Sequence, residues 1–266
     1  RRALRPLGLV VFNIVVADKA GDIFCISNGR VPKRDQRIDS RDLRPGHEAW
    51  ARWQGIHKLE ELPQLKNPKS GYLVNTNSGP QNVTPDEAPQ PDDFPPYFMG
   101  QHANSRWRRL SELLAADESI TWEEMIAYAT DTRVEAAHEY TPQIVSALRA
   151  GAESAGDAAA RLREAADVLD RWDRRTDVDS RGAVLFFHLF TNDAFVEATK
   201  SGDEQAMARA ADTVTEEVVE RFGGLDVEWG EFSRIRRGDV ELPIAGCGSN
   251  KTPGGVTAIS AALRPT

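Results

Sequence analysis

The sequence contains few of the residues that build metal centres and disulfide frameworks. Its 266 residues include two cysteines, Cys25 and Cys247, and five histidines, with no C-x-x-C or H-x-x-x-H spacing. Zinc sites and small disulfide-stapled domains depend on such clusters, so neither class fits this chain. Two cysteines pair only where the fold brings them close together, and the sequence leaves that question open.

Long apolar runs are also lacking. No run reaches the ~18–20 residues that span a bilayer. Residues 7–17 are apolar and follow arginines, but Asn13 interrupts them and no clear small-x-small cleavage site follows, so we expect no signal peptide. The formal net charge of -8 argues against nucleic acid or an anionic membrane surface as a partner. With 40% apolar and 28% charged residues, the chain has the composition of a soluble protein with a sizeable core.

The pattern of the chain predicts an α+β fold. Residues 9–17 and 23–27 form a predicted β-hairpin around a turn flanked by Asp18 and Asp22, and their β-branched density predicts strands buried on both faces. Two loops are expected at 32–50 and 79–101, the first anchored on the sheet by Trp50, Trp53 and Tyr72, which could alternatively line an acyl pocket. Helices are predicted at 105–116, 122–130, 132–149, 156–172, 181–199 and 203–222.

This pattern predicts three segments. Residues 1–103 are the sheet-rich part, 104–225 a helical block, and 226–266 a turn-rich return segment. In the last of these, Arg234-Ile235-Arg236-Arg237 is interpreted as a solvated turn rather than a binding patch.

The most informative stretch is Gly71 to Pro80. It contains the β-prone run Tyr72-Leu73-Val74, and a strand continued to Asn77 would place Asn75 and Asn77 on the same face. A side-chain amide held there offers uncharged N–H donors, which is what an oxyanion hole for acyl transfer requires. The alternative is ordinary turn chemistry before Gly79-Pro80.

The same stretch resembles the signature of the penicillin acylase family, which includes the acyl-homoserine-lactone, cephalosporin and aculeacin acylases. The matching residues are Asn67, Pro68, Ser70, Gly71, Tyr72, Asn75 and Asn77. Other segments are similar to further family motifs and occur in the same order as in the family. They are residues 13–23, 29–34, 53–55, 94–98, 106–114, 169–173 and 179–183.

The resemblance implies an N-terminal-nucleophile hydrolase: an αββα sandwich that carries a large helical block. Such enzymes cleave an amide in an acylated amine through an acyl-enzyme on an N-terminal serine, whose own α-amino group is the base. Asn77 then corresponds to the oxyanion-hole residue, and Arg106 is the best match for a supporting arginine. The resemblance leaves penicillins, acyl-homoserine lactones and lipopeptides open as substrates. If the substrate is a penicillin, the resemblance also implies a role in antibiotic biosynthesis.

The sequence departs from the family pattern at its start. It begins Arg1-Arg2-Ala3 instead of with Ser, Thr or Cys, and a guanidinium cannot act as a base. We therefore expect an internal fragment of the β subunit that is inactive alone and whose partners are the missing α subunit and the remaining β-subunit segments. The resemblance also implies a periplasmic or secreted location and calcium in the full-length protein, whereas we expect no cofactor or metal within this fragment.

Rival interpretations concern the helical half and other catalytic groups. Four aspartates around Trp172 lack the spacing of an EF-hand, and we expect Asp173 and Arg181 to tie two helices together. We expect His138 and His188, which lie in predicted helices, to be structural histidines.

The alternative function is a non-catalytic helical interaction module with acylase ancestry. A complete enzyme with an internal Ser-His pair finds no G-x-S-x-G motif.

Overall fold

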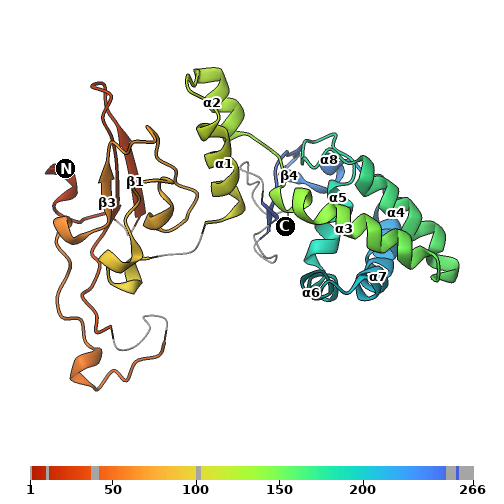
Figure 1. Ribbon diagram of the computed structural model, residues 1–266, viewed down its shortest axis with the longest axis horizontal. Helices are drawn as coiled ribbons and strands as arrows, with labels where there is room; N and C mark the ends of the chain where they lie inside the picture. Colours follow the sequence, from red (N-terminus) through yellow and green to blue (C-terminus); the bar gives the residue numbers. More distant parts are fainter. Residues whose placement is uncertain (1, 10–11, 37–41, 100–102, 250–255, 258–266) are drawn as a thin grey trace. The chain divides into compact units, whose positions relative to one another are not determined.

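A computed structural model describes residues 2–9, 12–36, 42–99, 103–249 and 256–257, and the chain divides into two compact units (Figure 1). The first unit is Arg1–Glu118 and the second is Ser119–Thr266. Helix α1 (Ser105–Ala115) therefore lies in the first unit, although the sequence groups it with the helices that follow.

The first unit contains the predicted hairpin. Its antiparallel sheet has the order β1-β2-β3, with β1 at Phe12–Ala17, β2 at Ile23–Asn28 and β3 at Gln64–Lys66. Asp18 closes the hairpin turn, because its Oδ1 accepts hydrogen bonds from the backbone N–H groups of Ala20 (2.8 Å) and Asp22 (3.1 Å). Asp18 therefore caps the turn that the sequence predicts between the two strands.

The prediction of two-sided burial is wrong for β1. Phe12 is 65% exposed, and Val15 and Val16 are also exposed. Side chains on a strand are buried by what packs on the two faces of the sheet. In the described residues, β1 is the edge strand of the sheet and its side chains are largely uncovered, whereas the central strand β2 buries Ile26. Ile26 packs with Leu59, Leu62 and Phe98 in the main apolar cluster of this unit.

The loops of the first unit contain short 3-10 turns. These are η1 (Arg2–Leu4), η2 (Ala49–Ala51), η3 (Leu59–Glu61), η4 (Pro80–Asn82), η5 (Pro91–Asp93) and η6 (Pro96–Phe98). Within the loop at 32–50, residues 37–41 lie outside the described residues. Trp53 is 66% exposed and does not anchor this loop, whereas Trp50 and Tyr72 are half-buried.

The second unit is built from helices, most of which the sequence predicts. They are α2 (Trp122–Ala129), α3 (Glu135–Ala152), η7 (Gly156–Ala158), α4 (Ala159–Arg171), α5 (Ala183–Thr191), α6 (Asp193–Ser201), α7 (Glu204–Phe222) and α8 (Trp229–Phe232). The short helix α8 was not predicted, because it lies in the segment that was expected to be turn-rich. The single helix predicted over 181–199 is instead two. Asn192 ends the first and caps the second, because its Oδ1 accepts a hydrogen bond from the N–H of Phe195 (3.0 Å).

Helices α3, α4, α5, α6 and α7 enclose one apolar core (Figure 1). Ile144 and Leu148 of α3 recur at a spacing of four, so they lie on one face and are fully buried together with Leu169 and Phe186. Close helix packing requires glycine at one point: a Cβ on Gly151 would lie 2.3 Å from the Cβ of Ala208.

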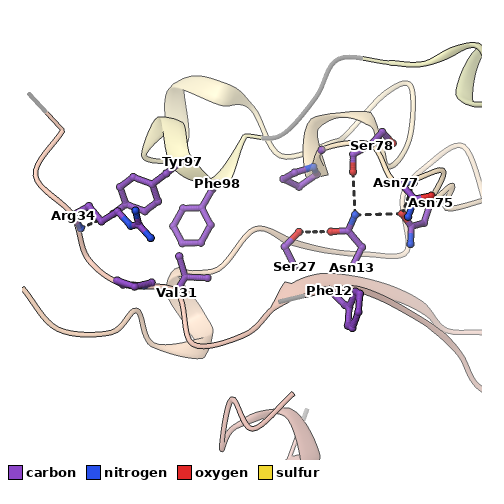
Figure 2. A pocket seen from close by; sticks show the side chains of 13 residues that line it. Phe12, Asn13, Ser27, Val31, Arg34, Asn75, Asn77, Ser78, Tyr97 and Phe98 are labelled. Atoms are coloured by element: carbon purple, nitrogen blue, oxygen red, sulfur yellow. Dashed lines mark hydrogen bonds between the residues drawn. The ribbon is translucent and has the colours of Figure 1, made fainter. Parts of the chain in front are cut away.

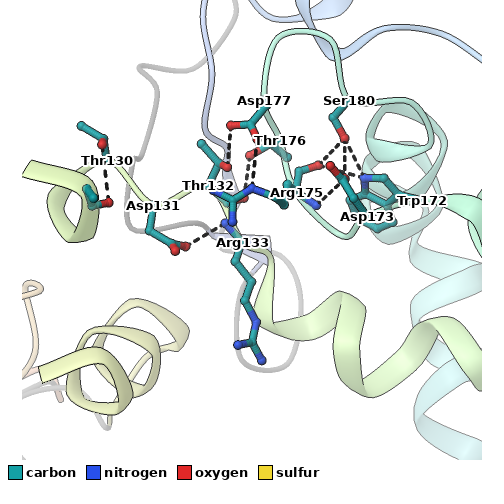
Figure 3. A network of polar contacts seen from close by, with 11 residues as sticks. Thr130, Asp131, Thr132, Arg133, Trp172, Asp173, Arg175, Thr176, Asp177 and Ser180 are labelled. Carbon is teal, nitrogen blue, oxygen red and sulfur yellow. Dashed lines mark hydrogen bonds and ion pairs between the residues drawn. The ribbon is translucent and has the colours of Figure 1, made fainter. Parts of the chain in front are cut away.

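Trp172 organises the connection between α4 and α5 (Figure 3). Its indole N–H donates to the carbonyl of Arg175 (2.8 Å) and to Ser180 Oγ (3.0 Å), and the Ser180 hydroxyl donates to Asp173 Oδ1 (2.9 Å). Asp173 therefore orders this loop, and the predicted pairing with Arg181 is wrong. Arg181 binds Glu228 instead, with 2.6 Å between Nη2 and Oε1.

After α8 the chain forms short strands. They are β4 (Arg234–Arg237), β5 (Val240–Pro243), β6 (Gly248–Ser249) and β7 (Val256–Thr257), paired β4-β5 and β6-β7. The arginine run interpreted as a turn is thus a strand. Glu241 on β5 accepts hydrogen bonds from Arg234 Nε (2.6 Å) and Arg236 Nε (3.0 Å), which holds this exposed hairpin in register.

Both cysteines are buried, and they do not form a disulfide with each other. Burial raises the pKa of the Cys25 thiol to about 11, so it is protonated and unreactive at neutral pH.

His188 lies between aromatic rings, with centroid distances of 6.0 Å to Phe222 and 5.3 Å to Phe232. Burial lowers the pKa of His188, and Arg221 acts in the same direction. This is a structural histidine, as predicted. Across the described residues, no helix is long and apolar enough to cross a membrane.

The contact between Gly182 and Trp172 yields a stability prediction. Gly182 has φ +107°, and a Cβ there would lie 2.7 Å from the Cβ of Trp172. We expect Gly182→Ala to lower the free energy of unfolding by about 2–5 kcal/mol, from left-handed strain and overpacking together. Urea denaturation followed by far-UV circular dichroism measures this loss.

Gly202 offers the matched control, because it has φ +70° but no atom within 4 Å of the position that a Cβ would take. Gly202→Ala should cost only the left-handed penalty of about 1–2 kcal/mol. Equal losses for the two variants would show that the Trp172 contact is not what requires glycine.

Candidate active site

The Gly71 to Pro80 stretch is a turn, not a strand, which corrects the predicted continuation to Asn77. The backbone of Val74 makes one hydrogen bond, from its N–H to the carbonyl of Val83 (2.8 Å), but the neighbouring residues form no ladder. Asn77 is left-handed (φ +60°), and its N–H donates to Asn75 Oδ1 (3.2 Å). Asparagine tolerates this conformation and stabilises it through such local bonds.

Helix α1 supplies the group that fixes this turn. Arg106 Nη2 donates to the carbonyl of Thr76 (2.6 Å) and to Asn77 Oδ1 (3.0 Å). Asn104, the N-cap of α1, donates from Nδ2 to the same Thr76 carbonyl (2.8 Å). The structure thus brings together Asn77 and Arg106, the two residues that the sequence singles out.

Arg106 also determines which way the Asn77 amide faces. A guanidinium has only donors, so the amide oxygen must be the atom that faces it. The amide NH₂ group then points away, and it donates to no group in the part of the chain that the structure describes. Asn77 is exposed, so these N–H donors are available to a ligand. Burial lowers the pKa of Arg106, but the group stays charged at neutral pH.

Asn77 opens onto a pocket of about 710 Å³ (Figure 2). Its apolar wall comprises Phe12, Val31, Pro32, Pro80 and Phe98. Its polar side chains are Asn13, Ser27, Arg34, Asn75, Asn77, Ser78 and Tyr97. Among these described lining residues there is no acid, so the site is lined by neutral dipoles and one cation. Such a wall favours a ligand that is neutral or develops negative charge.

Asn13 is a site residue that sequence reasoning did not single out. It lies on β1, and its Nδ2 donates to the carbonyl of Ser78 (3.0 Å) and to Asn75 Oδ1 (3.3 Å). Ser27 on β2 in turn donates from Oγ to Asn13 Oδ1 (2.7 Å). Asn13 therefore ties the sheet to the turn that carries Asn77. The available signal was a polar residue that interrupts an apolar strand.

The described residues provide donors but no activated nucleophile. Ser27 donates to an amide oxygen, which is not a base, and His57 bonds the Tyr97 hydroxyl (2.8 Å) rather than a serine. No group of three or more metal-ligating side chains occurs in the described ranges. The arrangement can therefore stabilise charge on a bound carbonyl oxygen, while bond cleavage needs a nucleophile from elsewhere.

Other predicted residues lie outside this pocket. Trp50, Trp53 and Tyr72 are not among its lining residues, so the acyl-pocket alternative for them finds no support. The aromatic-proline turn at 94–98 does contribute, through Tyr97 and Phe98.

Comparisons with known proteins identify the family of the chain. A family model described as penicillin amidase matches residues 1–263. Penicillin acylase 2 proenzyme from Pseudomonas sp. (strain SE83) is 29% identical over 210 residues, which are 77% of this chain and 24% of that protein. Penicillin G acylase from Escherichia coli is 36% identical over 76 residues, 29% of this chain and 9% of that protein.

A solved structure shares the fold. The thermostable penicillin G acylase from Alcaligenes faecalis superposes with a TM-score of 0.53 at 16% identity, covering 89% of this chain and 50% of that one. A fold of mixed helix and sheet is confirmed, whereas the αββα sandwich stays a prediction. The chain spans about a quarter of the length of the Pseudomonas relative. From the match over residues 1–263, the chain belongs to the penicillin amidase family.

Proposed function

We propose that this chain supplies the oxyanion-stabilising part of an amidase active site, in a protein that hydrolyses the carbon–nitrogen bond of an acylated amine. One observation carries the proposal: Arg106 holds the oxygen of the Asn77 amide, which leaves the N–H donors of this pocket-lining residue without a partner among the described residues. An immobilised neutral donor of this kind stabilises the charge that develops on a carbonyl oxygen under attack.

In the proposed reaction, the nucleophile is an N-terminal serine that lies outside this chain. Its Oγ attacks the amide carbon while its α-amino group takes the hydroxyl proton, and Asn77 donates to the oxygen that becomes negative. Collapse of the intermediate breaks the C–N bond, and the leaving amine takes the proton. Water then attacks the acyl-enzyme, releases the carboxylic acid and restores the serine.

The pocket lining and the name of one relative support a site that is divided between this chain and other segments of the protein. The pocket has an apolar wall suited to an acyl chain, and the relative from Pseudomonas is named a proenzyme, a protein made as a precursor. We propose that the partners are an α subunit and further β-subunit segments and that the location is periplasmic or secreted. A penicillin, an acyl-homoserine lactone or a lipopeptide would each supply the required amide.

The Asn77 amide provides the first test. The coding DNA on both sides of this segment identifies the full precursor, which is expressed and assayed for amine release from acylated substrates. We expect Asn77→Ala to lower kcat by about 10²–10³-fold, because one oxyanion donor is removed. Asn77→Asp should fail similarly, since an ionised carboxylate is only an acceptor.

Asn67 is a matched control. It is also a left-handed asparagine (φ +49°), but it does not line the pocket. Asn67→Ala therefore reproduces the backbone effect without the lost donor and should leave kcat within a few-fold of the parent. Unchanged turnover in Asn77→Ala would contradict the oxyanion role and favour a non-catalytic interaction module.

Arg106 provides the second test, because its proposed role is to orient Asn77. Arg106→Gln should lower kcat by about tenfold or more, because the charge-assisted hydrogen bonds to the Thr76 carbonyl and the Asn77 amide are lost. In an Asn77→Ala background the same substitution should lower kcat little further, because coupled residues are not additive. Arg108→Gln, at an exposed position on the same helix, is the control. Fully additive losses would show that Arg106 acts independently of Asn77.

A further inference from the structure

The turn that carries Asn77 is bound on a second side by the sheet (Figure 2). Asn13 of β1 donates from Nδ2 to the carbonyl of Ser78 (3.0 Å) and to Asn75 Oδ1 (3.3 Å). The same Asn75 oxygen accepts a hydrogen bond from the backbone N–H of Asn77 (3.2 Å). Two hydrogen bonds therefore lead from β1 to the backbone of Asn77 through one side-chain oxygen.

Backbone groups that bond in one way fix the orientation of both amides. The carbonyl of Ser78 is an acceptor, so the NH₂ group of Asn13 must face it, and the Asn13 oxygen then faces the hydroxyl of Ser27 (2.7 Å). The backbone N–H of Asn77 is a donor, so the oxygen of Asn75 must face it. Both requirements agree with the bond from Asn13 Nδ2 to Asn75 Oδ1, so the chain of bonds has a single direction.

The backbone of Asn77 needs such support. Its φ of +60° lies in the left-handed region, which residues with a side chain adopt at a cost, and Asn77 is exposed, so packing offsets little of that cost. The bond to Asn75 closes a local turn that favours this conformation. Arg106 binds the Thr76 carbonyl and the Asn77 side chain, and it leaves the Asn77 N–H to Asn75.

We infer that Asn13 and Asn75 are positioning residues, which hold the backbone of Asn77 in the conformation that presents its amide to a carbonyl under attack. The inference rests on the proposed function, because positioning affects the rate only if Asn77 is the oxyanion donor. Asn13 acts through the turn, since two protein acceptors occupy its NH₂ group. A donor that is ordered before the reaction stabilises the developing charge without reorganising during it.

Turnover by the full processed precursor tests the link from Asn13. Asn13→Leu keeps the volume of the side chain but has no donor, and it should lower kcat by about five- to tenfold with little change in KM, because a transition-state donor loses its hold. In an Asn77→Ala background the same substitution should leave kcat unchanged, because the donor that it positions is gone. Amine release is divided by the concentration of processed sites, counted by mass spectrometry, so incomplete maturation does not enter the rate.

Ile14→Ala is the matched control for a loosened strand. Ile14 follows Asn13 on β1, and its side chain packs in the apolar cluster around Ile26 on the other face of the sheet. The substitution should lower the melting temperature at least as much as Asn13→Leu does, while kcat stays within about twofold of the parent. Equal losses of kcat in the two variants would assign the effect to the strand as a whole and overturn the inference.

Asn75 allows a test by partial rescue. Asn75→Ala removes the acceptor for the Asn77 N–H and should lower kcat by about tenfold. Asn75→Ser keeps a hydroxyl that accepts the same N–H more weakly, so it should retain more of the parent activity than the alanine variant. Hydrogen exchange at the turn, followed by mass spectrometry, should be faster in Asn75→Ala than in Asn75→Ser. Equal kcat in the two variants overturns the positioning role of Asn75.

The outcomes separate the two proposals. A large loss of kcat in Asn77→Ala together with unchanged kcat in Asn13→Leu would leave the amidase standing and overturn positioning by the sheet. Unchanged kcat in Asn77→Ala would refute the oxyanion role itself. Faster hydrogen exchange at the turn in Asn13→Leu would then reduce the link from β1 to a structural one.

Discussion

The candidate site depends on one guanidinium that bonds two different parts of the same turn. Arg106 binds the backbone at Thr76 and the side chain at Asn77, so it fixes both the path of the turn and the direction of its amide. Because Asn77 is left-handed and exposed, little else would hold it. Asn104 bonds the same Thr76 carbonyl while it caps α1, so the start of the helix and the turn form one structural unit. Displacement of α1 would therefore disturb the amide, even though the helix does not line the pocket.

Local sequence signals predicted most of the elements but not how each is placed. The hairpin follows from β-branched runs around Asp18, and α4 and α7 follow from runs of good helix formers, because these preferences act over a few residues. The exposure of β1 could not be predicted, since burial depends on which distant segments pack on the faces of the sheet. The break at Asn192 was missed because apolar periodicity continues across it, while a single side-chain cap decides the boundary.

The site was predictable only in part, for a related reason. The family resemblance pointed to Asn77 and Arg106, and the structure joins them by a direct hydrogen bond. The sequence did not identify Asn13 as a site residue, because its role depends on contacts with Asn75 and Ser78, which are 62 and 65 residues away in sequence. Tyr97 belonged to a recognised aromatic-proline turn, yet its hydroxyl becomes informative only when His57, 40 residues earlier, is placed against it. Long-range pairing of this kind leaves no periodic signal in the sequence.

The charge distribution links the two sides of the pocket. The chain has 41 acidic residues against 33 lysines and arginines, yet the described lining of this pocket contains Arg34 and no acid, with Arg106 behind Asn77. A locally positive wall on an acidic protein concentrates the field where low-dielectric side chains limit screening. In the proposed reaction, the same field would lower the energy of an oxyanion at Asn77. Because an oxyanion exists only during the reaction, a donor at Asn77 would act on the rate rather than on the binding of substrate.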